Sequence, residues 1–354
     1  MSAKKSKTSF FKKVLIAIVF IIVLGGSIAA YEIYDSVYLP NVSLKKTEFT
    51  YLYIKTGSTI DGVIDQLYSR GIIINKNTFN WVAEKKNYAN HVHPGKYLIK
   101  NHLNNNDLIN LLRSGKQTPV KLSLNNCVRK KEYFISEICK ALEVDSLKLD
   151  KLLNDDQFLA AYDLNSETAI ALFIANTYEF YWNTSAEKFV TKMGEEYNKF
   201  WTQERIQKAN EIGLKPAEVI TLASIVQNET IRDTDRPIIA GVYINRLKKN
   251  MPLQADPTLV WASGDFSINR VLNVHKEIDS PYNTYLHTGL PPGPICMVDK
   301  KNIDAVLNYQ KHNYLYFCAK EDFSGYSNFA ENYEQHQLNA RRYQKALNEK
   351  GIQH

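Results

Sequence analysis

The sequence predicts an α+β protein that contains an N-terminal transmembrane helix, a small α+β module and a larger α+β domain. Three observations support this prediction: a long uncharged apolar run near the start, short segments rich in aromatic and β-branched residues, and longer segments with helical periodicity. The length alone suggests two or three domains. The predicted parts are a basic cytoplasmic tail over 1–13, the transmembrane helix over 14–31, a connector over 32–46, the small module over 47–118 and the larger domain over 119–354.

The net positive charge lies mainly at the N-terminus. The formal charge is +7, and residues 1–13 hold five lysines and no acidic residue. The rest of the chain therefore carries only about +2. A nucleic-acid surface would need basic residues clustered on the folded part, so we expect no nucleic-acid partner.

Residues 14–31 form a run of 18 uncharged, mostly apolar residues. As a helix this run would span roughly 27 Å, close to the hydrocarbon core of a bilayer. The preceding lysines predict a single-pass protein of the cytoplasmic (inner) membrane, with its N-terminus inside and the larger domain on the outer, periplasmic face. The small residues of Ser27-Ile28-Ala29 would also suit a cleaved signal peptide, but the length of the run favours a retained anchor.

The small module begins with a predicted strand over 49–54, the turn Gly57-Ser58-Thr59 and a predicted helix over 60–69. Further predicted elements are a helix over 76–84, a strand over 95–99, and a helix capped by Asn106 that ends at Gly115. The strand, the glycine turn and the following helix resemble a LysM-like module, a glycan-binding fold. A spacer domain without ligand is the alternative.

The larger domain is predicted to begin with a strand and to continue mainly as helices. We expect the strand over 120–124 and helices over 131–142, 146–153, 155–162, 185–200 and 203–212, then one opened by Pro216 and one from Pro237 to Leu247 capped by Asp235.

Glu229 is the candidate catalytic residue. It follows Val226 by three residues and Ile225 by four, so a helix would place its side chain on their apolar face. A carboxyl on such a face should have a raised pKa and keep its proton near neutral pH, as a general acid for glycosidic cleavage must. The alternative is a structural glutamate at a helix end, paired with Arg232 or Arg236.

Polar residues in proline-rich segments follow this helix. Residues 254–258, 280–285 and 289–294 are predicted to be loops, because prolines and glycines interrupt them repeatedly. Polar side chains on loops held by prolines suit a groove for a hydroxyl-rich ligand. Ordinary surface loops are the alternative.

These stretches together resemble the family of endolytic murein transglycosylases, the YceG-like family. The order of anchor, module and larger domain resembles that family over the whole chain. The motifs that carry the resemblance lie at residues 176–180, 222–230, 245–247, 253–258, 282–285, 289–293 and 314–317.

The resemblance implies cleavage of the β-1,4 bond between N-acetylmuramic acid and N-acetylglucosamine within peptidoglycan strands, leaving 1,6-anhydro ends. It implies that Glu229 is the catalytic residue, and Gln227 replaces a glutamate that many relatives carry. It also implies a role in ending strand elongation, with wall synthases (penicillin-binding proteins) as partners. The candidates for binding saccharide are Gln254, Asp256, Thr258, Asn283 and Tyr285, with Tyr178 and Glu179 in addition.

Two positions depart from the family pattern. Ser327 stands where the family often has a histidine, and His336-Gln337 stands where it has a His-Asn pair. The resemblance therefore assigns no histidine role at the first of these positions.

Two other functions are compatible with the sequence. One is a two-carboxylate muramidase, a hydrolase in which Asp256 or Glu179 supplies the second carboxylate. The other is a membrane-anchored scaffold that binds wall glycans without catalysis. We expect no cofactor and no metal site, because His91-Val92-His93 has no evident third ligand nearby. The four cysteines would allow three disulfide pairings, and their spacing selects none.

Overall fold

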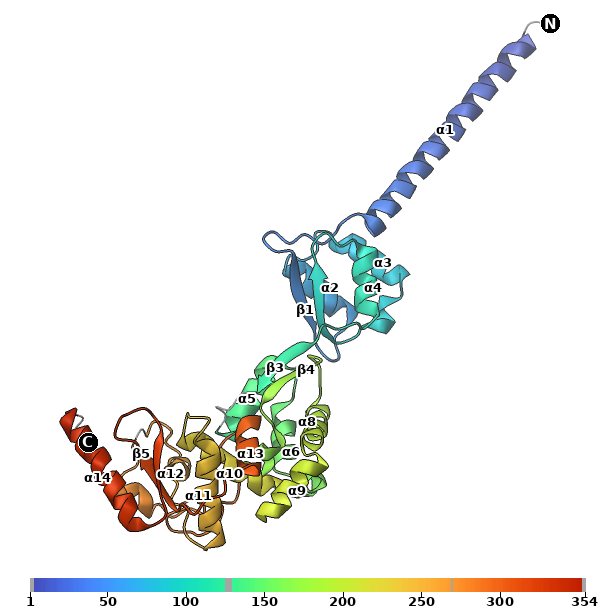
Figure 1. The fold of residues 1–354 in the computed structure, drawn as a ribbon. Coiled ribbons are helices and arrows are strands. Elements are labelled where there is room, and N and C mark those ends of the chain that lie inside the picture. The colour runs from blue at the N-terminus through green and yellow to red at the C-terminus, as the bar shows by residue number, and fades with distance from the viewer. Residues whose placement is uncertain (1–2, 125–128, 269, 352–354) are drawn as a thin grey trace. The chain divides into compact units, whose positions relative to one another are not determined.

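The computed structural model describes residues 3–124, 129–268 and 270–351, with side chains from Phe10 onward. Cys127, one of the four cysteines, lies outside the described residues. The chain divides into two compact units, one of residues 1–120 with 181–183 and one of 121–180 with 184–354. Both helix and strand occur, and the strands form two-stranded sheets of β1 with β2, β3 with β4, and β5 with β6 (Figure 1).

The first unit contains α1 (Ala3–Tyr38), β1 (Phe49–Ile54), α2 (Ile60–Ser69), α3 (Lys76–Lys85), the 3-10 turn η1 (Tyr88–His91), β2 (Gly95–Lys100) and α4 (Asn105–Arg113). The α1 helix continues to Tyr38, beyond the predicted end at residue 31. Its segment Phe10–Tyr38 has a mean hydropathy of 2.7 in its most apolar window and is long enough to cross a membrane. Its apolar side chains are exposed, as Phe20 is at 65%.

The core of the small module lies between its antiparallel strand pair and its helices. Inward-facing Leu52 and Ile54 of β1 are buried with Leu67 of α2 and Phe79 of α3. The opposite face of β1 presents aromatic side chains because successive residues of a strand point to opposite faces. The N-cap of α4 is Asn104 rather than Asn106, since its side chain accepts the bond from the Asp107 amide at 2.8 Å.

The remaining elements belong to the second unit, apart from Val120, the first residue of β3, which ends the first unit. They are β3 (Val120–Leu124), α5 (Lys131–Ala141), α6 (Ser146–Leu153), α7 (Asp156–Leu159), η2 (Ala160–Tyr162), η3 (Ala169–Leu172), β4 (Asn176–Phe180), α8 (Ala186–Phe200), α9 (Gln203–Ile212), α10 (Pro216–Glu229), α11 (Arg236–Lys248), α12 (Asp256–Ser263), η4 (Asn273–Glu277), α13 (Lys300–Leu307), β5 (Tyr316–Ala319), β6 (Ser327–Ala330) and α14 (Tyr333–Glu349). The predicted strands and helices up to residue 212 are found, with 155–162 divided into α7 and η2.

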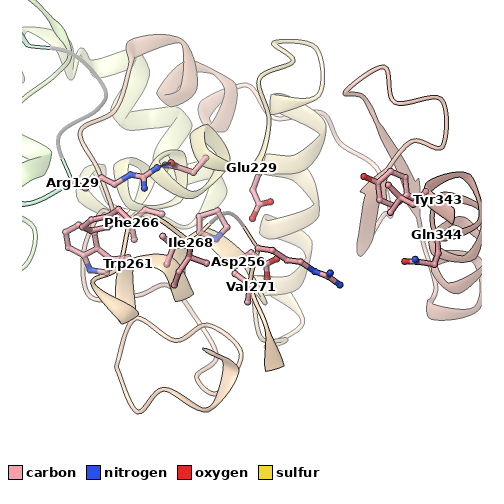
Figure 2. A pocket seen from close by; sticks show the side chains of 15 residues that line it. Arg129, Glu229, Asp256, Trp261, Phe266, Ile268, Val271, Tyr343 and Gln344 are labelled. Carbon is pink, nitrogen blue, oxygen red and sulfur yellow. Dashed lines mark hydrogen bonds between the residues drawn. The ribbon is translucent and has the colours of Figure 1, made fainter. Parts of the chain in front are cut away.

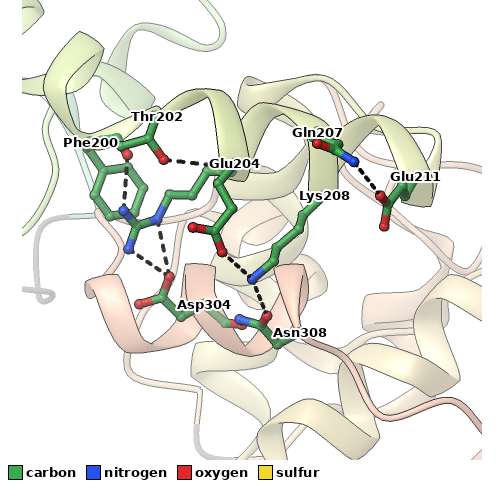
Figure 3. A network of polar contacts seen from close by, with 9 residues as sticks. Phe200, Thr202, Glu204, Gln207, Lys208, Glu211, Asp304 and Asn308 are labelled. Atoms are coloured by element: carbon green, nitrogen blue, oxygen red, sulfur yellow. Dashed lines mark hydrogen bonds and ion pairs between the residues drawn. The ribbon is translucent and has the colours of Figure 1, made fainter.

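The α10 helix is the central helix of this unit. Its residues from Val219 to Val226 are all buried, so it is covered on every side rather than along one apolar stripe. It packs against α9, α11, α12 and α13. The neighbouring helices α9 and α13 are also joined by a polar network, in which Arg205 contacts Asp304 and Lys208 contacts Asn308 (Figure 3).

Two predictions near the site need correction. Asp235 is the N-cap residue of α11, as predicted, but its side chain makes no capping hydrogen bond, and its Oδ2 accepts the Ser327 amide at 2.8 Å instead. Residues from Asp256 onward form the helix α12 rather than a loop. Pro257 lies in the first turn of α12, where its missing N–H costs no helical hydrogen bond.

The segment 289–294 is a loop, as its prolines and glycines predict. Gly293 in it is buried, and a Cβ atom there would lie 2.1 Å from the Glu167 carbonyl oxygen. Only glycine allows the two backbones to approach so closely.

Candidate functional site

Glu229 is the last residue of α10, and its side chain lines a cavity of about 710 Å³. The cavity wall also includes Asn228 of α10, Asp256 of α12 and Tyr343 of α14. Figure 2 shows the Glu229 carboxyl directed into this space, with Asp256 on the same side of the cavity. The central helix thus ends with an acidic group at a cavity of the size that binds small ligands.

The Glu229 carboxyl has one direct hydrogen-bond donor among the described side chains. Tyr243 of α11, only 1% exposed, donates its phenolic O–H to Glu229 Oε1 at 2.6 Å. Burial raises the pKa of Glu229 to about 7, although the Tyr243 hydrogen bond acts to lower it. The negative charge of Asp256 adds to the increase, and the positive charge of Arg246 opposes it. The group is therefore a carboxylic acid that holds its proton close to neutral pH.

The alternative of a glutamate paired with an arginine does not describe this site. Arg232 donates to the Ser324 carbonyl oxygen and stacks on Tyr326, while Arg236 pairs with Asp233. No salt bridge within the described part of the chain includes Glu229.

Arg246 holds the backbone around the acidic residues. Its guanidinium donates to the carbonyl oxygens of Leu315 and Leu253, each at 2.7 Å. Leu253 leads into α12, so these bonds join α11 to the segment that carries Asp256. Burial lowers the pKa of Arg246, but a guanidinium stays charged. Its charge acts on Glu229 from a position fixed by the protein's own carbonyls.

Asp256 and Tyr285 form a second hydrogen-bonded pair of a carboxylate and a tyrosine. Asp256 is exposed in the cavity, and the Tyr285 hydroxyl donates to its Oδ1 at 2.6 Å. Burial and the nearby Asp256 carboxylate raise the pKa of Tyr285 above its ordinary value. The structure therefore brings together Glu229, Asp256 and Tyr285 from the predicted set.

Three other predicted binding residues, Gln254, Thr258 and Asn283, lie in the same region. Two of them direct their side chains to partners within the protein. Thr258 and Asn283 are fully buried. The Thr258 hydroxyl bonds the Ala255 carbonyl and the Thr284 hydroxyl, while Asn283 donates to the carbonyls of Lys276 and Ile278. Gln254 is exposed with a positive φ of 50°. The side chains of Thr258 and Asn283 thus stabilise the backbone conformation around the cavity.

Tyr178 and Glu179 lie on β4, and neither lines the cavity at Glu229. Tyr178 is buried and donates its hydroxyl to the Ile174 carbonyl at 2.5 Å. Glu179 is exposed, and its backbone carbonyl accepts a bond from Lys192. The structure does not bring this pair to the Glu229 cavity.

The sequence reasoning missed an aromatic and basic wall of the cavity. Trp261 at the end of α12 lies 6.0 Å from Phe266, ring centre to ring centre. Arg129 stacks over Phe266 at 5.3 Å and donates to Asn228 Oδ1 at 3.2 Å. Trp261 and Phe266 closely follow the Asp256 motif, and this proximity could have identified them as candidate cavity residues. Arg129 is 100 residues from Glu229 in the sequence, so no local pattern links the two.

Replacing Tyr243 with phenylalanine should raise the pKa of Glu229 above about 7, because the lost hydrogen bond stabilises the carboxylate. An increase of roughly one unit corresponds to the loss of one such bond. NMR titration of carbon-labelled glutamate side chains measures the change. Tyr314→Phe is the matched control, since Tyr314 packs on Phe329 in the same unit, and it should leave the pKa of Glu229 in place. An unchanged or lower pKa in Tyr243→Phe would contradict this role.

The chain is similar to known proteins over most of its length. Residues 52–342 match the YceG-like family. An endolytic murein transglycosylase of Bacillus subtilis is 39% identical over 169 residues, covering 48% of this chain and 46% of that protein. One from Streptococcus pneumoniae is 27% identical over 351 residues, covering 89% of this chain and 62% of that protein. The chain thus spans about half to three fifths of the length of these relatives.

A solved structure shows the same relation. The crystal structure of a putative yceG-like protein from Listeria monocytogenes has a TM-score of 0.53 and 26% sequence identity, covering 82% of this chain and 98% of that one. The family match covers well over half of the sequence and includes Glu229. The chain therefore belongs to the YceG-like family.

Proposed function

We propose that this protein is an endolytic lytic transglycosylase that cleaves the β-1,4 bond between N-acetylmuramic acid and N-acetylglucosamine in peptidoglycan. The observation that carries the proposal is the Glu229 carboxyl, which lines a cavity of about 710 Å³ and has a pKa of about 7. The names of the curated relatives support the same reaction class.

The proposed reaction uses one carboxyl group twice. Glu229 donates its proton to the glycosidic oxygen as the bond from that oxygen to C1 of the muramic residue breaks. The 6-hydroxyl of the same residue then attacks C1, and the Glu229 carboxylate accepts the hydroxyl proton. The products are a free 4-hydroxyl and a 1,6-anhydro end, with no water consumed. The bound sugar's geometry replaces a second carboxylate, since an internal nucleophile is already close to C1.

The neighbouring residues support both protonation states. The Tyr243 O–H bond stabilises the carboxylate that remains after the first proton transfer, while burial favours the initial acid. The Asp256 charge would stabilise positive charge on the sugar ring at the transition state. Gln254 and Tyr285 are proposed to contact the saccharide, and Thr258 and Asn283 to shape the loop that presents them.

A muramidase is the second candidate, because Asp256 lines the same cavity as Glu229. Glu179 is a weaker choice for the second carboxylate, since it lies on β4 outside that cavity. The Tyr285 hydroxyl already binds one Asp256 oxygen, which favours a charge-stabilising carboxylate over a water-activating one. Hydrolysis would give muramic ends heavier by one water than anhydro ends.

Glu229→Gln should abolish the anhydro product, with a loss of at least about a hundredfold in rate, while glycan binding persists. Mass analysis of digested peptidoglycan strands measures both the amount and the type of end. Glu211→Gln, an exposed change on α9, is the control and should retain activity. Full activity in Glu229→Gln would contradict the catalytic role of Glu229. Hydrolysed ends from the wild-type protein would favour the muramidase. If the wild-type protein cleaves no strand at all, the non-catalytic scaffold is favoured.

The anchor is proposed to hold the protein in the cytoplasmic membrane with its second unit on the outer face. Support comes from the long apolar helix Phe10–Tyr38 and from the lysines before residue 14. Alkaline phosphatase, fused after His354, should be active only if that end is exported. An inactive but intact fusion would contradict the orientation.

In this location the enzyme would act where wall synthases extend strands, and we propose penicillin-binding proteins as its partners and strand termination as its role.

The small module is proposed to bind glycan as a LysM-like domain. Its order of strand, two helices and strand, with β1 antiparallel to β2, supports this proposal. The outer face of β1 carries Phe49, Tyr51 and Tyr53, and the Trp182 ring lies 5.2 Å from that of Tyr53. Such rings offer flat apolar faces to sugars.

Tyr53→Ala should weaken binding of the full Glu229→Gln chain to insoluble peptidoglycan by roughly fivefold to tenfold, because one stacking ring is lost. A pelleting assay measures the bound fraction. Tyr68→Ala on α2, also exposed, is the matched control and should bind as the parent does. Equal binding by the parent chain, Tyr53→Ala and Tyr68→Ala would indicate that the module is a spacer domain without ligand.

A further inference from the structure

A second cavity, of about 460 Å³, adjoins the cavity at Glu229. The two share Arg129, Trp261 and Phe266 as lining residues, so these three side chains form their common border. The reaction described above uses no group that lines the second cavity alone. This space is therefore available for a part of the substrate other than the cleaved disaccharide.

Three consecutive cations line the second cavity. Arg129 and Lys130 each lie over the Phe266 ring at 5.3 Å, and Lys131 donates to Asn154. None of the three forms a salt bridge with any residue that the structure describes. Surface cations cost little without a partner, but three in one cavity create a positive potential that favours an anionic ligand.

Two carboxylates also line this cavity, and they leave the balance positive. Glu167 accepts the Tyr282 hydroxyl at 3.1 Å, so one of its oxygens is already bound. Glu132 lies in the first turn of α5, where a negative charge is favourable in itself. Three cations against two acids leave a net charge of about +1 beside the substrate cavity.

Another part of the wall is apolar. The Trp261 ring lies 5.7 Å from the Tyr282 ring, and Phe173, Ile170 and Pro294 line the same cavity. A free inorganic anion would leave these surfaces uncovered. The combination suits a ligand with aliphatic groups and carboxylates, the composition of a short acidic peptide.

We propose that the second cavity binds a carboxylate-bearing peptide that is attached to the saccharide in the Glu229 cavity. This inference rests on the proposed function, because peptidoglycan strands carry peptides on their sugars. The aromatic pair then separates a saccharide site from a peptide site. The enzyme is accordingly selective for strands that keep their acidic peptides, and Lys130 and Lys131 determine that selectivity.

The test uses the full chain in detergent and three soluble substrates: strands with peptides, strands stripped of peptides by an amidase, and strands whose peptide carboxylates are amidated. The wild-type kcat/KM should be about tenfold higher on the first than on the other two, as one charge-assisted contact supplies. In the double variant Lys130→Glu and Lys131→Glu this ratio should fall to about one. Lys148→Glu, exposed on α6 outside both cavities, is the matched control and should keep the wild-type ratio.

A wild-type ratio near one, or an unchanged ratio in the double variant, would overturn the proposal. Preference for peptide strands that survives amidation would overturn the role of charge, as would tighter binding of polyphosphate than of peptide-bearing strands. Binding measured in Glu229→Gln, with and without the two lysine changes, separates this inference from the reaction. If the wild type binds peptide-bearing strands preferentially but cleaves none, the proposed transglycosylase reaction is contradicted and the peptide site is supported. If it cleaves strands without any preference, the reaction is supported and the peptide site is contradicted.

Discussion

The burial of α10 is the constraint on which the rest of the second unit depends. Because every residue from Val219 to Val226 is enclosed, each polar group on the helix needs a partner inside the protein. The Ser224 hydroxyl accepts the Ile295 amide at 3.0 Å, and Gln227 binds the Asp299 amide and the Met297 carbonyl. These bonds join the helix to the segment after the glycine- and proline-rich loop. A single buried helix thereby positions both its own terminal carboxyl and the adjoining cavity wall.

The electrostatics of Glu229 follow from the same arrangement. Removing its carboxyl from water favours the neutral form, and the Tyr243 hydroxyl partly restores the charged form at 2.6 Å. Burial is the larger of the two effects, and the resulting pKa is about 7, where a group both donates and accepts protons readily. Tyr243 and Arg246 both come from α11, which packs against α10. The contact between these two helices therefore places the groups that act on the pKa of Glu229.

The two cavities divide the site by chemistry. Around Glu229 the wall combines carboxyl, amide and guanidinium groups with Trp261 and Phe266, which suits a sugar. The second cavity shares Arg129 and these rings and adds Lys130, Lys131 and apolar groups. The N-terminal start of α5 supplies these cations, and α12 with its following segment supplies the rings. Elements from distant parts of the chain thus contribute different groups to neighbouring parts of one site.

The sequence by itself determined the local elements and the candidate acid. The aromatic and β-branched residues of Phe49–Ile54 and the helical periods of α2 and α8 are local patterns of a few residues, so they can be recognised in the sequence alone. Glu229 was found because its motif is local. Only the tertiary structure decided that Asp256 begins a helix, that Asp235 binds Ser327, that Thr258 and Asn283 face inward, and that Arg129 reaches the cavity. Those outcomes depend on contacts between residues far apart in the chain, and hydrophobic periodicity contains no information about which distant partner a polar side chain will meet.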